Sequence, residues 1–199
     1  MTSRQQKQRV LVVGICALVV GALASLLKGN GDGLLGAMSE AASPWLLLGF
    51  VGGAYAGKRR LGFGALCGLE ATILGLLGFY FVNSFVVHFG PYGWFTDLHL
   101  AALSGVKYFA LAIVSGTTFG ALGAWWRRQL SPVLVVAVGL LFIVEGLVRA
   151  LEGPSWDQYV DQVAAIEVVV GLLWMVVALT KTRSLRRENK YSDAPLTKV

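Results

Sequence analysis

Three glutamates, Glu70, Glu145 and Glu167, stand inside long apolar stretches of this sequence. Burying an ionisable side chain in a bilayer is costly, so such residues usually pair with another charge or bind something. Glu145 follows Pro132 by 13 residues and Glu167 precedes Thr180 by 13. In helices, both separations correspond to a height of about 20 Å above the cytoplasmic membrane edge. The spacing predicts that Glu145 and Glu167 share one site in the outer half of a membrane bundle.

A basic residue and two tryptophans accompany this pair. Arg149 lies four residues after Glu145 and therefore on the same helical face, and Trp94 and Trp156 lie near the same outer mouth. Acidic and aromatic groups together suit a small polar or cationic solute. We expect Glu145, Arg149 and Glu167 to be ligand contacts, with Trp94 and Trp156 as aromatic walls. The alternative is an ion pair that only joins helices and tryptophans of the interfacial belt.

Glu70 lies near the middle of its apolar stretch, and Thr117 and Thr118 come to a similar height in a later stretch. A threonine hydroxyl at this height is expected to hydrogen-bond the carboxyl group. These three residues are therefore predicted to be buried polar groups, with Glu70 a neutral, hydrogen-bonded acid. The alternative is that Glu70 couples a proton to another process.

No arrangement typical of catalysis is present. The sequence lacks H-E-x-x-H, G-x-S-x-G, a Cys–His constellation and a phosphate-binding loop. We therefore expect no enzyme activity, no metal site and no cofactor.

The elements that must position these residues are apolar stretches that recur along the chain. Of its 199 residues, 56% are hydrophobic and 14% are charged, which is a membrane composition. About 20 helical residues cross a bilayer core of roughly 30 Å. The sequence predicts an all-α membrane bundle over 10–180, between a basic N-terminus (1–9) and a basic tail (181–199). About six transmembrane helices are expected, at 10–27, 45–57, 61–87, 106–126, 132–151 and 164–180.

The basic residues predict the orientation of this bundle. Only three of the 17 Lys and Arg residues, Lys28, Lys107 and Arg149, fall on one side of the predicted membrane, and the other 14 fall on the opposite side. By the positive-inside rule, both termini are cytoplasmic. This asymmetry also accounts for the net charge of +6 without a nucleic-acid partner. The first apolar run, which contains Ala22-Leu23-Ala24, is alternatively a cleavable signal peptide.

The second predicted span is short. As a helix, Pro44 to Gly57 reaches about 21 Å, and Ser43-Pro44 is a favourable N-cap and N1 pair. This predicts a helix that begins below the outer surface, with the preceding loop dipping inward. A tilted helix or a thinned bilayer explains the length equally well. The inward-pointing N-terminus would attract an anion, so the charge of any ligand stays open.

A stripe of small residues follows one face of the first span: Gly14, Ala17, Gly21 and Ala24. Small residues let another helix approach closely. We expect this stripe to pack within the bundle, and the alternative is that it docks another membrane protein.

Two resemblances add to this interpretation. Phe119-Gly120-Ala121-Leu122-Gly123-Ala124-Trp125-Trp126-Arg127, followed by Val144-Glu145-Gly146-Leu147, resembles a family of small six-span bacterial membrane proteins of unknown function. This resemblance implies a fold but no activity. The chain is also loosely similar to the substrate-binding subunits of energy-coupling-factor transporters, where an Ala-x-x-x-Ala motif meets the coupling subunit. Ala17-Leu18-Val19-Val20-Gly21 is only a near match.

Together these features predict a solute-binding or transport component of the bacterial inner membrane, embedded in the lipid bilayer, with its site in the outer half. The alternative is a structural or accessory subunit without a ligand of its own, whose glutamates only tie helices together.

Overall fold

The computed structural model describes residues 3–28, 33–39, 41–56, 60–87, 94–151 and 159–192. Every regular element within these ranges is helical, which confirms the all-α prediction. The elements are α1 (Ser3–Lys28), α2 (Leu34–Ser39), α3 (Ser43–Ala56), α4 (Leu61–Val82), the π-helical η1 (Asn83–Val87), α5 (Trp94–Gln129), α6 (Pro132–Leu151) and α7 (Val160–Ser192).

Five helical stretches among the described residues are long and apolar enough to cross a membrane: Gln5–Lys28, Leu61–Phe85, Gly105–Gln129, Pro132–Leu151 and Val160–Leu185. Many of their leucine and valine side chains are exposed on the bundle surface, as expected for contact with lipid. The chain is therefore a helical membrane protein. Helix α3 has 14 residues, about 21 Å of helix, and is too short to count among them. A sixth span and the orientation of the termini remain predictions.

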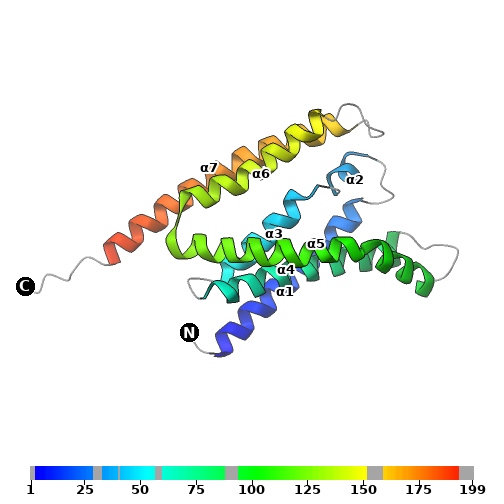
Figure 1. Ribbon diagram of the computed structural model, residues 1–199, viewed down its shortest axis with the longest axis horizontal. Helices are drawn as coiled ribbons and strands as arrows, with labels where there is room; N and C mark the ends of the chain where they lie inside the picture. The colour runs from blue at the N-terminus through cyan, green and yellow to red at the C-terminus, as the bar shows by residue number, and fades with distance from the viewer. Residues whose placement is uncertain are drawn as a thin grey trace, which may run out of the picture.

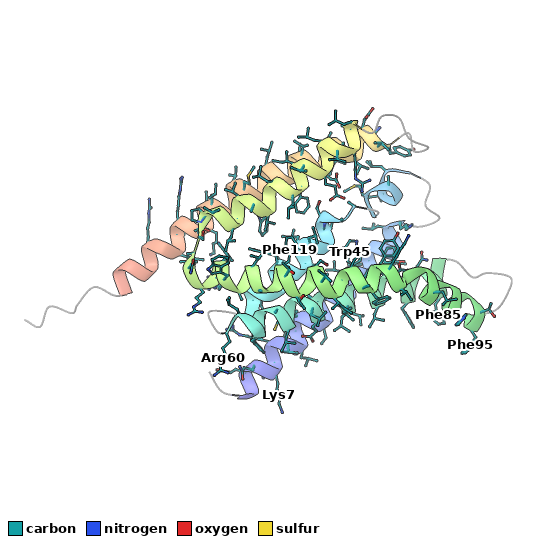
Figure 2. The ribbon with its side chains drawn as sticks, in the orientation of Figure 1. Lys7, Trp45, Arg60, Phe85, Phe95 and Phe119 are labelled. Carbon is teal, nitrogen blue, oxygen red and sulfur yellow. The ribbon has the colours of Figure 1, made fainter. Side chains whose placement is uncertain are left out.

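The two ends of the bundle differ in character. The start of α1, the turn between α5 and α6, and the end of α7 all lie toward one end (Figure 1). Figure 2 shows Lys7 and Arg60 at this end, which we call the basic end, and Phe85 and Phe95 at the opposite or far end.

Helix α4 packs against α1, α3 and α5 to form a first unit. Glycines bring these backbones together. A methyl group added at Gly21 of α1 would collide with the carbonyl oxygen of Gly75 in α4, and one at Gly53 of α3 would collide with that of Gly120 in α5. Because the helices already touch through their main chains, this unit has no room for larger side chains at these points.

The small-residue stripe of α1 lies in this packing. Ala17 is fully buried, and a methyl group at Gly14 would meet the side chains of Glu70 and Leu74. The stripe thus packs within the bundle. Gly14, Ala17 and Gly21 are buried there and Ala24 is half-buried. The alternative, a second membrane protein docked on the first helix, stays a prediction.

Helices α6 and α7 form a hairpin that packs mainly on itself, and Gly139 and Gly171 face each other across it. Figure 1 shows the hairpin along one side of α3 and α5. Phe50 of α3 packs against Val138 and Phe142 of α6, and further large side chains of α3, α5 and α7 join this cluster: Leu47, Phe119, Leu122, Trp126 and Trp174. The hairpin is therefore a second unit, joined to the first by large side chains and with few close backbone contacts.

The turn from α5 to α6 is short and tightly defined. The Leu130 N–H donates to the carbonyl oxygen of Trp126 at 2.6 Å, and Leu130 adopts a positive φ of 51°. Such a left-handed residue ends a helix, although glycine usually takes this position. Pro132 then begins α6, at the predicted start of the fifth span, and its fixed φ and missing N–H suit the first position of a helix.

Candidate functional site

The amino end of α3 meets a carboxylate from α6. The backbone N–H groups of Ala42 and Ser43 donate to the two oxygens of Glu145 at 2.7 and 2.8 Å, and the Ser43 hydroxyl donates to the same carboxylate. The first N–H groups of a helix have no partner within it, and they carry the positive end of the helix dipole. Glu145 therefore caps α3 from a helix about 100 residues away in the chain.

Arg149 connects this cap to the second carboxylate. Its Nη2 donates to Glu145 Oε1 at 3.3 Å from the next turn of α6, and its Nε lies 3.5 Å from Oε2 of Glu167 on α7. The structure thus brings together the three polar residues predicted to share a site. Their formal charges are two negative and one positive, which leaves a net charge of −1.

Glu167 differs sharply from Glu145 in its surroundings. It is only 5% exposed, yet neither of its carboxylate oxygens accepts a hydrogen bond from the described residues. Buried charged groups normally have hydrogen-bond partners, because losing water without replacement costs free energy. Within the described part of the chain, the Glu167 carboxylate has only the Arg149 ion pair, and its oxygens accept no hydrogen bond.

A small cavity of about 70 Å³ adjoins Glu167. Among the described residues of its lining, Glu167 alone is charged, and the others are apolar side chains from α2, α3, the short link between them, α6 and α7. They are Met38, Ala41, Pro44, Phe142, Val163, Ile166 and Val170. The cavity therefore combines an apolar wall with a single buried carboxylate.

The site owes its depth to the interruption between α2 and α3. Glu145 lies six residues before the end of α6, and Glu167 lies seven residues after the start of α7. Both are therefore about 10 Å from the far ends of their helices. Because Glu145 caps α3, α3 begins at this depth, and α2 occupies the space beside α7 at the far end (Figure 1). Helix α3 therefore begins below the far ends of α6 and α7, and its start below the membrane surface stays a prediction.

The two predicted aromatic walls cannot be related to this site. Trp94 is the first residue of α5, but its side chain lies outside the described part of the structure, and so does the whole of Trp156.

The predicted contact between Glu70 and the α5 threonines is wrong. The Thr117 hydroxyl donates to the carbonyl oxygens of Ile113 and Val114 in its own helix, and Thr118 is exposed. Glu70 instead lies beside Gly14 of α1. Equal height did not place these residues on facing sides of their helices.

A different threonine joins α4 to α5. The Thr72 hydroxyl lies 3.2 Å from the carbonyl oxygen of Ala112, and Thr72 is buried. Thr72 lies two residues after Glu70 in α4, so its side chain points in a different direction, toward α5. The heights predicted from the sequence gave no information about this direction.

Sequence reasoning also missed the partners of Glu145. The start of the short helix at Ser43-Pro44 and its attraction for an anion were both predicted, but the anion is the chain's own Glu145. The depth of Glu145 in the predicted bundle matches the depth of the predicted helix start at Ser43-Pro44, and this match could have identified Glu145 as the anion. No sequence signal marked the apolar lining of the cavity, since Met38, Phe142 and Val163 look like ordinary membrane residues.

Comparison with known proteins gives a family but no activity. A family described as being of unknown function (DUF6518) matches residues 1–190. No curated protein and no solved structure matches the chain. The predicted family resemblance is thereby confirmed at the level of a family of unknown function, and the looser transporter likeness stays a prediction.

Proposed function

This chain belongs to a family of unknown function, and we propose that it is a solute-binding component of a membrane transport system, with its site at Glu167. A non-catalytic role agrees with the lack of catalytic motifs in the sequence. The site is the cavity between α2, α3 and the α6–α7 hairpin.

The buried state of Glu167 is the observation that carries this proposal. A carboxylate that is 5% exposed and accepts no hydrogen bond from the described residues lines a cavity with apolar walls. Ionisable residues inside membrane segments commonly mark solute or ion pathways. A bound solute that donates hydrogen bonds would supply what Glu167 lacks.

The arrangement of the helices supports a transport role in particular. The cavity lies between the unit of α1, α3, α4 and α5 and the α6–α7 hairpin, whose backbones approach each other closely at few points. Transporters often hold solutes at such a junction, beside a helix that begins within the membrane, and rock one helix group against the other. The start of α3 beside Glu145, about 10 Å from the far end of α6, supports such an arrangement.

We further propose that the basic end faces the cytoplasm of a bacterium and that the site opens toward the outer side. The excess of Lys and Arg at the predicted inner loops supports this orientation. The six-span description belongs to the same proposal, with α3 as the short span.

The test is native mass spectrometry of the full chain, extracted from its own host in a mild detergent, with Glu167→Gln and Glu70→Gln alongside. Glu70→Gln is the matched control, because it changes another glutamate of the bundle remote in sequence from the cavity. We expect a small adduct on the wild type and on Glu70→Gln that is absent from folded Glu167→Gln. An adduct retained by Glu167→Gln, or no adduct on the wild type, would contradict the proposal.

A structural or accessory subunit is the second candidate, and the contacts of Glu145 favour it. This carboxylate is occupied by three donors from Ala42 and Ser43 and by Arg149, so it joins α3 to α6 without a ligand. A stoichiometric protein partner and no adduct in the same spectra would support this candidate instead.

A further inference from the structure

We propose that the solute is a small protonated alkylamine, with its ammonium group on Glu167 and its carbon against the apolar wall. This inference rests on the proposed function and adds the chemical class of the solute.

The charges of the cluster favour a cation. Arg149 is shared between two carboxylates, and Glu145 also receives the N–H groups and hydroxyl at the start of α3. Glu167 receives none of these donors. A monovalent cation beside Glu167 would neutralise the remaining negative charge where the low dielectric makes this interaction strong. An anion would meet an under-compensated carboxylate and is excluded.

The lining favours an ammonium group over a metal ion. Hard metal ions such as Mg²⁺ and Ca²⁺ take about six to eight oxygen ligands, and alkali-ion sites use rings of carbonyl oxygens. The described residues that line this cavity are apolar apart from Glu167, and no group of three or more His, Cys, Asp or Glu among the described residues could hold a metal. An ammonium group needs only an acceptor for its N–H donors, which Glu167 provides.

The apolar wall then selects an alkyl group. Val163 and Phe142 are themselves buried, so an alkyl carbon placed beside them leaves water and gains contacts. Bare ammonium would leave this wall unused. An amine with one short alkyl group satisfies both parts of the cavity.

The size of the cavity limits the solute. Its volume of about 70 Å³ is far below the roughly 300–1,000 Å³ of pockets that hold drug-sized ligands, so the solute is small. Methylammonium is a small amine of this kind. Tetramethylammonium is larger and has no N–H donor, so it cannot hydrogen-bond the carboxylate.

Equilibrium dialysis of the purified full-length protein with radiolabelled methylammonium tests this inference. We expect saturable binding of about one methylammonium per chain for the wild type and for Glu70→Gln. Binding should weaken at least tenfold in Glu167→Gln. Excess unlabelled methylammonium should compete, whereas sodium and tetramethylammonium at equal ionic strength should not.

A second variant guards against misfolding of Glu167→Gln. Ala41→Val adds two methyl groups beside the cavity without changing any charge, and it should also weaken methylammonium binding. Unchanged binding in both variants, equal competition by sodium or tetramethylammonium, or no saturable binding by the wild type would overturn the inference.

The two proposals can fail separately. A Glu167-dependent adduct of another mass, together with no methylammonium binding, would overturn the alkylamine while the solute site stands. If the wild type shows no adduct and no methylammonium binding, both proposals are overturned.

Discussion

The contact between α1 and α4 is made by different kinds of residues from the contact between α3 and α6. The first contact is made by glycines, with Gly21 against the backbone of Gly75 and Gly78 against that of Leu18. The second contact is made by charged and polar side chains, with Glu145 on the amino end of α3 and Arg149 beside it. Both contacts join helices of the same bundle, yet they differ in the free volume and the charge that they contain.

The backbone contacts at Gly21 and Gly78 leave no volume and involve no charge, so they fix the first unit through close packing. The polar contact holds buried charges and adjoins a cavity of about 70 Å³. Charges in such a place are kept at a cost in stability and commonly serve a function. The comparison therefore assigns rigidity to the α1–α4 contact and ligand chemistry to the α3–α6 contact.

The largest expected effect comes from removing the cap of α3. Glu145→Ala leaves the N–H groups of Ala42 and Ser43 unpaired and takes one carboxylate from Arg149. Because breaking a partly buried charged network leaves the other groups unsatisfied, we expect a loss of about 3 kcal/mol in unfolding free energy. Denaturation in detergent measures this loss, and hydrogen exchange should rise at the start of α3 but not in α1. Faster exchange throughout α1 and α4 would contradict the division into two units.

Gly21→Ala should have the next largest effect, because its methyl group would collide with the carbonyl oxygen of Gly75 and separate α1 from α4. Overpacking of this kind destabilises by roughly 2 kcal/mol. Thermal unfolding in detergent measures it. Gly62→Ala is the matched control, since a methyl group at Gly62 meets nothing within 4 Å. Equal stability of the two variants would remove the distinction between the contacts.

Trp126→Phe tests the contact between α5 and α7 near the basic end. The indole Nε1 donates to the Thr182 hydroxyl at 3.2 Å, and Thr182 is buried. Losing one such hydrogen bond in a membrane bundle costs about 1 kcal/mol or less. The midpoint of chemical denaturation should fall slightly while methylammonium binding is retained. Loss of binding here would mean that the site depends on the whole hairpin contact.

Glu167→Gln should have the smallest effect on stability. The carboxylate accepts no hydrogen bond from the described residues, so an amide of the same shape removes an under-satisfied charge while Arg149 keeps Glu145. We expect a change in unfolding free energy below about 1 kcal/mol. The same unfolding experiment measures it. A loss as large as that of Glu145→Ala would show that Glu167 is structural, and it would reverse the roles given to the two glutamates.

Much of the fold follows from the sequence. The fifth span was predicted at 132–151 and α6 is Pro132–Leu151, because a proline starts a long apolar run whose only charged residues are Glu145 and Arg149. The helix beginning at Trp94 extends well before the predicted start at 106. Its early part includes the polar residues Asp97 and His99, so hydropathy alone did not detect it.

The candidate site was predicted only in part. Glu145, Arg149 and Glu167 share one height because helical rise is fixed, and they do lie together. Glu70 and Thr117 also share a height, but rotation about the helix axes and the choice of neighbours keep them apart. The depth of a residue follows from counting residues along its helix. The neighbour that its side chain faces depends on which helices pack against each other.

The sequence by itself determined the membrane helices, the ionisable residues within them and the height of each, since hydrophobic length and helical rise depend on the chain alone. The tertiary structure decided which of two similar glutamates is used for structure. It set the start of α3 against Glu145 and left Glu167 beside an apolar cavity. That division depends on contacts between segments distant in the chain, and no local pattern of residues records which partner a buried charge will meet.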